Sequence, residues 1–144
     1  MPGPRQSLDD YVRDRVAQLY ALGGDVGAAT GTVDDERGEW ATLQGVVAFG
    51  EFNLGLLSIF EDIERGPDGI PHRRKYAYHC AYDQAFLFRH DFDPVVHPDM
   101  PYHKHLPPDG RRVEWERVTL QEAVDEFWPL VTDRDEERRL EESD

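Results

Sequence analysis

The sequence contains a single cysteine, Cys80, among its 144 residues. One thiol cannot form a disulfide within the chain, so the fold has to rest on a hydrophobic core. A chain of this length buries about 68–70% of the surface that its unfolded form exposes, which is enough for one domain spanning residues 1–144. A lone thiol is also typical of a reducing compartment, and we expect the protein to be cytoplasmic.

Long hydrophobic runs are absent as well. No stretch of about 18 consecutive apolar residues occurs, which argues against a helix that spans a membrane. The segment from Met1 to Arg5 lacks the basic and apolar regions of a signal peptide. We therefore expect neither a membrane partner nor a secretory signal.

Positive charge is scarce and unevenly distributed. The chain has 16 lysine and arginine residues against 30 aspartate and glutamate residues, for a net charge of −14. Such a surface repels phosphate backbones and anionic lipids over most of its area. Residues 72–112 are the exception, because they hold seven basic and five acidic residues together with all six histidines. An anionic ligand is therefore expected to bind within this segment.

An amphipathic helix is predicted near the N-terminus. Apolar residues from Leu8 to Tyr20 recur at helical spacing, and Ser7 is placed to cap the first turn. The segment 23–38 that follows contains glycine, alanine, threonine and aspartate without periodicity. It is predicted to be a flexible linker.

A second amphipathic helix is predicted near the C-terminus. Thr119 and Glu122 have the spacing of a capping box, and an apolar stripe continues from there to Trp128. Pro129 is expected to kink or end this helix. Residues 133–144 are almost wholly charged and are expected to form a solvated, frayed helical tail.

Strands are predicted between the two helices. Asp83-Gln84 is expected to make a tight turn between two of them, and the five prolines of residues 94–110 argue against a central strand there. No alternation of strands and helices is present, so a parallel sheet is not expected. We predict an α+β fold, in which an antiparallel meander sheet of four to five strands packs against an N-terminal and a C-terminal helix. The expected strands lie within residues 40–49, 52–63, 73–82, 85–92 and 112–118.

Candidate catalytic residues lie in two short segments of the histidine-rich region. Arg89 and Asp91 are two residues apart, as are His103 and His105. In extended backbone this spacing places both members of a pair on one face. Histidine transfers protons near neutral pH, and Arg89 can stabilise a developing phosphate charge. These four residues are therefore predicted to be catalytic, with no metal or cofactor.

Two other interpretations use the same histidines. His103 and His105 can bind a metal ion if Asp91, Asp93 or His97 supplies a third ligand. Alternatively, the histidines only donate hydrogen bonds to backbone carbonyls in a proline-rich segment. The sequence alone leaves these alternatives open.

A nucleic-acid surface is predicted from basic and aromatic residues. The tyrosines at positions 76, 78 and 82 alternate along one strand, where they can stack on bases or pack in the core. Cys80 lies in the same row and is expected to be buried and inert. The residues predicted to bind nucleic acid are Arg73, Lys75, Lys104 and Arg111.

Three segments resemble the TumE-type toxins of toxin–antitoxin modules. They are residues 74–79 (RKYAYH), 86–91 (FLFRHD) and 101–106 (PYHKHL). That family tends to show a tyrosine-rich strand, a strand ending in Arg-x-Asp, a short His-x-His element and a closing amphipathic helix. The resemblance covers roughly residues 72–130. It implies a small α+β toxin neutralised by an antitoxin, with Arg89, Asp91, His103 and His105 at the matched positions.

The sequence thus predicts a TumE-like toxin component that acts on RNA. One alternative is a non-catalytic binding or assembly protein, for example one that forms a homo-oligomer. Another is a small protein that binds a metal through histidine and aspartate.

Overall fold

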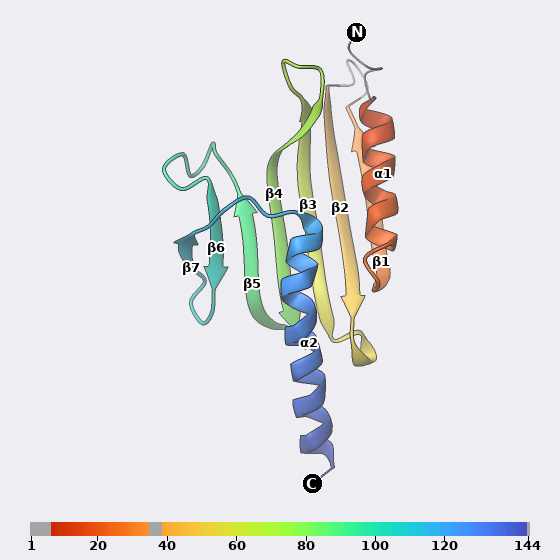
Figure 1. Ribbon diagram of the computed structural model, residues 1–144, viewed down its shortest axis with the longest axis vertical. Helices are drawn as coiled ribbons and strands as arrows, with labels where there is room; N and C mark the ends of the chain where they lie inside the picture. Colours follow the sequence, from red (N-terminus) through yellow and green to blue (C-terminus); the bar gives the residue numbers. More distant parts are fainter. Residues whose placement is uncertain (1–6, 35–38, 144) are drawn as a thin grey trace.

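Seven strands form one antiparallel sheet in the computed structural model, which describes residues 7–34 and 39–143. Each strand pairs with its neighbours in the sequence, so the sheet is a meander with β1 at one edge and β7 at the other (Figure 1). The strands are β1 (Asp25–Val33), β2 (Trp40–Phe49), β3 (Gly55–Arg65), β4 (Pro71–Tyr82), β5 (Ala85–Phe92), β6 (Tyr102–Leu106) and β7 (Arg111–Glu114).

Two helices, α1 (Leu8–Tyr20) and α2 (Leu120–Glu142), lie on the same face of this sheet (Figure 1). Both predicted caps are confirmed. Ser7 Oγ accepts a hydrogen bond from the Asp10 amide at 3.0 Å. Thr119 and Glu122 bond each other's backbone amides at 3.1 and 3.0 Å, which completes the capping box.

The core lies between the helices and the sheet. Phe127 of α2 packs edge-on against Phe49 of β2 and Phe88 of β5, with ring centroids 5.9 and 6.3 Å apart. Leu19 of α1 is fully buried and lies close to Gly45, where a Cβ would come within 2.7 Å of it. We call this side of the sheet the covered face and the opposite side the helix-free face.

The predicted fold class is confirmed, but the number of strands is wrong. Residues 25–33, expected to belong to a flexible linker, form strand β1. Glycine and alanine have low β-propensity, yet pairing with β2 and packing against α1 outweigh it. A Cβ at Gly31 would lie only 2.0 Å from Val12 Cγ1, so the missing side chain lets α1 approach the sheet closely. Residues 35–38 of the expected linker lie outside the described residues.

The proline-rich segment also contains a strand that the sequence argument excluded. Strand β6 (Tyr102–Leu106) lies between β5 and β7. Pro101 and Pro107 flank it, and the five residues between them include no proline. Every amide of β6 is therefore available for the ladder.

Helix α2 continues past Pro129 to Glu142 and includes most of the charged tail. Asp135 is buried rather than solvated, because it accepts hydrogen bonds from the Glu51 amide at 2.9 Å and from the Tyr82 hydroxyl. Val131 packs against Gly55 at the start of β3. These contacts, made by residues that follow Pro129 in the chain, hold the second half of α2 against the sheet.

Strand β4 directs its tyrosines to the covered face. Tyr76, Tyr78 and Tyr82 are buried there together with Cys80, as the packing interpretation predicted. Stacking of these tyrosines on RNA bases is therefore ruled out. The Tyr78 hydroxyl donates to Glu61, which is fully buried and also pairs with Arg15 of α1 at 3.0 Å. This network joins α1 to the middle of the sheet.

The turn predicted at Asp83-Gln84 is present. Tyr82 pairs with Ala85, and both turn residues have positive φ angles, 47° and 68°. Two consecutive left-handed residues match the right-handed twist of a hairpin. No helix among the described residues is long and apolar enough to cross a membrane.

Candidate active site

Polar side chains form two adjacent rows across the helix-free face. The strand register aligns Ser58, His79, Arg89, His105 and Arg112 from β3 to β7. The next row contains Phe60, Ala77, Asp91, His103 and Glu114. The four residues predicted to be catalytic occupy neighbouring positions in these rows, on β5 and β6.

Asp91, His103 and His105 form what we call the Asp–His cluster. One ligand atom from each lies within 4.8 Å of the others. Asp91 Oδ2 is 3.2 Å from His105 Nε2 and 3.4 Å from His103 Nε2. Asp91 Oδ1 forms an ion pair with Arg89 Nε at 2.9 Å.

Backbone carbonyls orient both imidazole rings. His103 Nδ1 lies 3.0 Å from the carbonyl oxygen of Met100, and His105 Nδ1 lies 2.9 Å from that of Gly110. The interpretation in which the histidines only bond backbone carbonyls predicted these contacts. It does not account for the buried Nε2 of His103, which has no hydrogen-bond partner among the described residues. Arg89 Nη2 lies 2.9 Å from His105 Nε2.

The members of this site differ in their access to solvent. The side chain of Arg89 is 38% exposed and that of His105 15% exposed, whereas that of His103 is 0% exposed. Burial lowers the pKa of His103 from its ordinary value, although the Met100 carbonyl and Asp91 oppose this effect. A large ligand on this face can therefore contact Arg89 and His105 but not His103.

The residues predicted to bind nucleic acid are not gathered on one surface. Arg73 lies on the covered face, where it donates to Tyr78 and to the Val118 carbonyl at 2.7 and 2.9 Å. Lys104 is buried on that face as well, and the register places Arg111 on the same side. Among the four, only Lys75 lies on the helix-free face, beside Phe60 and 3.5 Å from Asp93.

Two residues outside the predicted catalytic set contribute to the site. Arg112 lies opposite His105 in the ladder and contacts His97. The His97 ring is 5.0 Å from that of His103, edge to face. Arg112 and Glu114 are two residues apart, so the sequence could have predicted that they share one face of β7. It could not predict which face this is, because the β6–β7 register cannot be read from the sequence.

A second ionic cluster lies on the covered face and was missed by the sequence analysis. Glu126 of α2 accepts hydrogen bonds from His90 at 2.7 Å and from Lys104. The Lys104 ammonium also lies over the rings of Phe88 and Trp115, at 4.9 and 4.5 Å from their centroids. Glu126 belongs to α2, whereas His90 belongs to β5 and Lys104 to β6. Their hydrogen bonds therefore attach α2 to these two strands.

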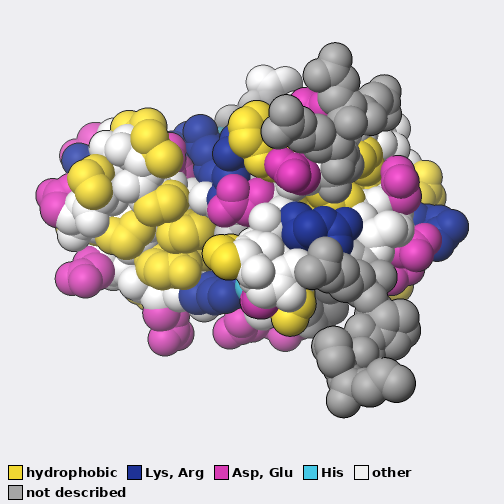
Figure 2. All heavy atoms as spheres, turned by 90° about the horizontal axis from the view of Figure 1, so that it is seen from above, with side chains coloured by type: hydrophobic (Ala, Val, Ile, Leu, Met, Phe, Trp, Pro, Cys, Tyr) yellow, Lys and Arg dark blue, Asp and Glu magenta, His cyan; other side chains and the backbone are white. Residues whose placement is uncertain are grey.

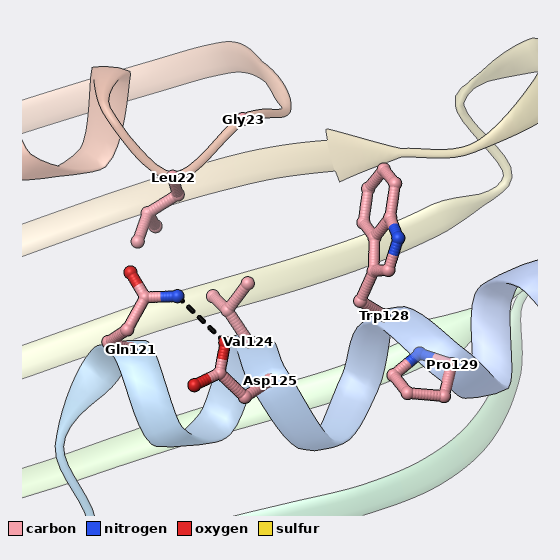
Figure 3. Close-up of a pocket in the computed structure, with 7 residues that line it drawn as sticks. All are labelled: Leu22, Gly23, Gln121, Val124, Asp125, Trp128 and Pro129. Atoms are coloured by element: carbon pink, nitrogen blue, oxygen red, sulfur yellow. Dashed lines mark hydrogen bonds between the residues drawn. The ribbon is translucent and has the colours of Figure 1, made fainter.

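A cavity of about 340 Å³ lies between the C-terminal end of α1 and helix α2 (Figure 3). Gln121 and Asp125 line it and bond each other at 2.9 Å, while Trp128 points toward the end of β2. Its other lining residues are Leu22, Gly23, Val124 and Pro129. Asp125 is its single ionisable side chain, so this cavity lacks the convergent groups found in the Asp–His cluster.

The fold and the site define a class of protein. It is a small α+β protein with an open antiparallel sheet, whose uncovered face carries a solvent-facing centre of arginine, aspartate and histidine. A family model described as "Toxin TumE" matches residues 32–135. The chain belongs to the TumE toxin family, as the resemblance in residues 72–130 indicated. The match extends toward the N-terminus to include β2 and β3, and it contains all four predicted catalytic residues.

No curated protein and no solved structure matches the chain. The family match supports a toxin component of a toxin–antitoxin system.

Proposed function

We propose that this TumE-family toxin acts on RNA by cleaving its phosphodiester backbone at Arg89 and His105. The observation that carries the proposal is the convergence of Arg89, Asp91, His103 and His105 on the helix-free face. A cognate antitoxin is the partner that family membership suggests. The proposal assigns each of the four residues a different part of the reaction.

Arg89 would bind the scissile phosphate. Its guanidinium is part-exposed; Nε pairs with Asp91 and Nη2 contacts His105, so Nη1 is the nitrogen atom that would face a ligand. Arg112 lies in the same row, one strand beyond His105, and Lys75 lies on the same face. Lys75 is paired with Asp93, so the proposed phosphate contacts are local to Arg89 and Arg112 on a molecule that is acidic as a whole.

His105 would accept the proton of the attacking hydroxyl group. Its Nδ1 donates to the Gly110 carbonyl, so the neutral ring presents Nε2 as an acceptor. A 2′-hydroxyl group placed there loses its proton to Nε2 while its oxygen attacks phosphorus. The bond between phosphorus and the 5′-oxygen breaks, the leaving 5′-oxygen takes a proton from water, and a 2′,3′-cyclic phosphate remains. RNA has this group and DNA lacks it, which is why RNA is the proposed substrate.

Asp91 and His103 would act as positioning residues. Asp91 holds Arg89 through one oxygen and faces His105 with the other. His103 is too deeply buried to touch RNA, so its proposed role is to pack beside Asp91, with Nε2 3.4 Å from Oδ2.

The first prediction concerns cleavage of a labelled single-stranded RNA by purified, untagged protein. We expect cleavage of the RNA and no cleavage of DNA of the same sequence. His105→Ala should lower the rate by at least about 10²-fold, because it removes the proton acceptor. Arg89→Ala should lower it by about 10²–10³-fold, because it removes stabilisation of the phosphate charge.

Matched controls are available away from the site. His72 is exposed at the start of β4 and pairs with Asp68, and Arg13 is exposed on α1. His72→Ala and Arg13→Ala should leave the rate unchanged. Intact RNA after incubation with a folded wild type, or equal rates for His105→Ala and His72→Ala, would reject the proposal.

A non-catalytic binding role is the second candidate, and one observation favours it. Figure 2 shows hydrophobic side chains gathered at the end of the molecule where β5, β6 and β7 lie. In the β5–β6 connection Val95 and Val96 are 86% and 63% exposed. If binding through this loop is the activity, Val95→Ser with Val96→Ser would abolish growth inhibition by the toxin and His105→Ala would not. The RNA proposal predicts the opposite pattern.

A further inference from the structure

We propose that Asp91, His103 and His105 bind one divalent transition-metal ion. This inference concerns what the three side chains bind, and it stands whether or not RNA is the substrate. It follows from the placement of protons and lone pairs in the Asp–His cluster, from the distances between its ligand atoms, and from the chemistry of the three donors.

Both histidines hold their ring protons away from Asp91. His103 Nδ1 bonds the Met100 carbonyl oxygen and His105 Nδ1 bonds that of Gly110, at 3.0 and 2.9 Å. A carbonyl oxygen can only accept, so each Nδ1 carries a proton. In the neutral form of each ring the lone pair then lies on Nε2, the atom that both rings turn toward the carboxylate.

Arg89 supports this assignment for His105. A guanidinium is only a donor, so its contact of 2.9 Å makes His105 Nε2 an acceptor. The same nitrogen lies 3.2 Å from Asp91 Oδ2 and has no proton to offer it. Two acceptors that face each other at this distance repel unless a cation lies between them.

His103 provides the independent observation. Its Nε2 is buried and, among the residues that the structure describes, no group satisfies it with a hydrogen bond. A buried polar atom without a partner destabilises the fold, and a bound ion would supply the missing partner. This atom points toward Asp91 Oδ2, 3.4 Å away.

The separations suit a metal ion of ordinary bond length. Ligands at about 2.0–2.2 Å from a tetrahedral ion lie roughly 3.3 Å from one another. The two contacts of Asp91 Oδ2 with the histidines measure 3.2 and 3.4 Å, and all three ligand atoms lie within 4.8 Å. Binding one ion at these bond lengths requires ligand atoms closer together than 4.8 Å, so the inference includes a rotation of the imidazole rings when the ion binds.

The surroundings resemble those of a metal site beyond the ligands themselves. Metal-binding histidines commonly donate their other ring N–H to a carbonyl, as His103 and His105 do. Asp91 is oriented through Oδ1 by Arg89, which leaves Oδ2 for the ion. Two imidazoles and one carboxylate suit zinc, manganese, iron(II) or nickel rather than magnesium or calcium, which prefer oxygen ligands.

Metal binding and the proposed RNA cleavage are separate hypotheses, and each can be tested without the other. With an ion bound, the His105 Nε2 lone pair would be engaged by the metal and would no longer accept the proton of a hydroxyl group. Without an ion, His105 itself accepts the proton. Metal content and RNA cleavage can therefore be measured on the same preparation and can fail independently.

The experiment is zinc binding by untagged wild-type protein, first stripped with a chelator. Isothermal titration calorimetry should show about one equivalent of Zn²⁺ bound, and cobalt(II) should give visible d–d absorption typical of nitrogen and oxygen ligands. Asp91→Asn and His105→Gln should each weaken zinc binding by about 100-fold or more, since each removes a ligand with little change of shape. Magnesium should not compete.

The control is His79→Ala, which removes a histidine beside Arg89 in the same row but outside the Asp–His cluster. Its zinc affinity should equal that of the wild type. Absence of zinc binding by folded wild type, or equal affinity in Asp91→Asn and wild type, would overturn the inference. RNA cleavage that persists in chelator would leave the proposed function intact, and zinc binding without RNA cleavage would leave only the metal site.

Discussion

At the scale of single residues, two acidic side chains have opposite roles on the two faces of the sheet. Asp91 lies on the helix-free face, where Arg89 orients it and leaves one oxygen directed at histidine lone pairs. Glu126 belongs to α2 on the covered face, and both of its oxygens are used, one by His90 and one by Lys104. The first arrangement leaves binding capacity, whereas the second is saturated and contributes to stability.

Glu126 leads to a prediction about pH. Burial by itself would raise the pKa of Glu126, but the hydrogen bonds from His90 and Lys104 outweigh it, so the pKa lies below its ordinary value. A depressed folded-state pKa means that Glu126 stabilises the fold above the ordinary glutamate value of about 4.3 and that this contribution is lost as the pH falls through the folded pKa. Glu126→Gln should therefore lower stability by about 1–2 kcal/mol at pH 7, and by progressively less as the pH falls below the ordinary glutamate value.

Thermal unfolding between pH 7 and pH 3 measures this difference. Asp125→Asn is the matched control, because Asp125 is exposed on the same helix and bonds only Gln121 among the contacts shown. Its melting temperature should follow that of the wild type at every pH. A difference in melting temperature between wild type and Glu126→Gln that stays constant from pH 7 to pH 3 would contradict the stabilising role of the Glu126 carboxylate.

At the scale of elements, α2 shows which parts of a helix local sequence can predict. The capping box at Thr119 and Glu122 depends on neighbouring residues, so the start of the helix could be predicted and was confirmed. Its continuation past Pro129 could not, because it depends on contacts with distant segments. Asp135 bonds the Glu51 amide, and Val131 packs on Gly55.

Removal of the Asp135 carboxylate tests this explanation. Asp135→Ala should destabilise the protein by about 2–3 kcal/mol, because the Glu51 amide and the Tyr82 hydroxyl lose their acceptor in a buried place. Urea unfolding of wild type and variant measures the difference. Asp133→Ala, at an exposed position two residues earlier, should change stability by less than about 0.5 kcal/mol. Equal effects of the two substitutions would mean that the second half of α2 does not hold the sheet.

At the scale of the whole molecule, the two faces of the sheet have different roles: one holds the core and the other holds the candidate site. The covered face holds both helices, the aromatic core and the buried ionic networks around Glu61 and Glu126. The helix-free face holds the Asp–His cluster. Since the basic residues of the histidine-rich segment are split between these faces, the local excess of positive charge in residues 72–112 does not produce one basic surface.

The net charge of −14 leads to a prediction for the intact protein. Like charges repel more strongly in the compact state than in the unfolded chain, and salt screens this repulsion. Raising sodium chloride from about 0.02 to 0.5 M should therefore increase the melting temperature by several degrees. Differential scanning calorimetry measures it, with sucrose of equal osmolality as the uncharged control. A lower melting temperature in salt would show that attractive ion pairs outweigh the repulsion.

The sequence alone determined the features that depend on near neighbours. These are the two helix caps, the Asp83-Gln84 turn, and the pairing of Arg89 with Asp91 and of His103 with His105 on common faces, because helix and strand periods relate residues only a few positions apart. The tertiary structure decided that β6 forms at all and that its register brings both pairs together. Register depends on contacts between segments distant in the chain, and a shift of one residue would have turned His103 and His105 to the covered face.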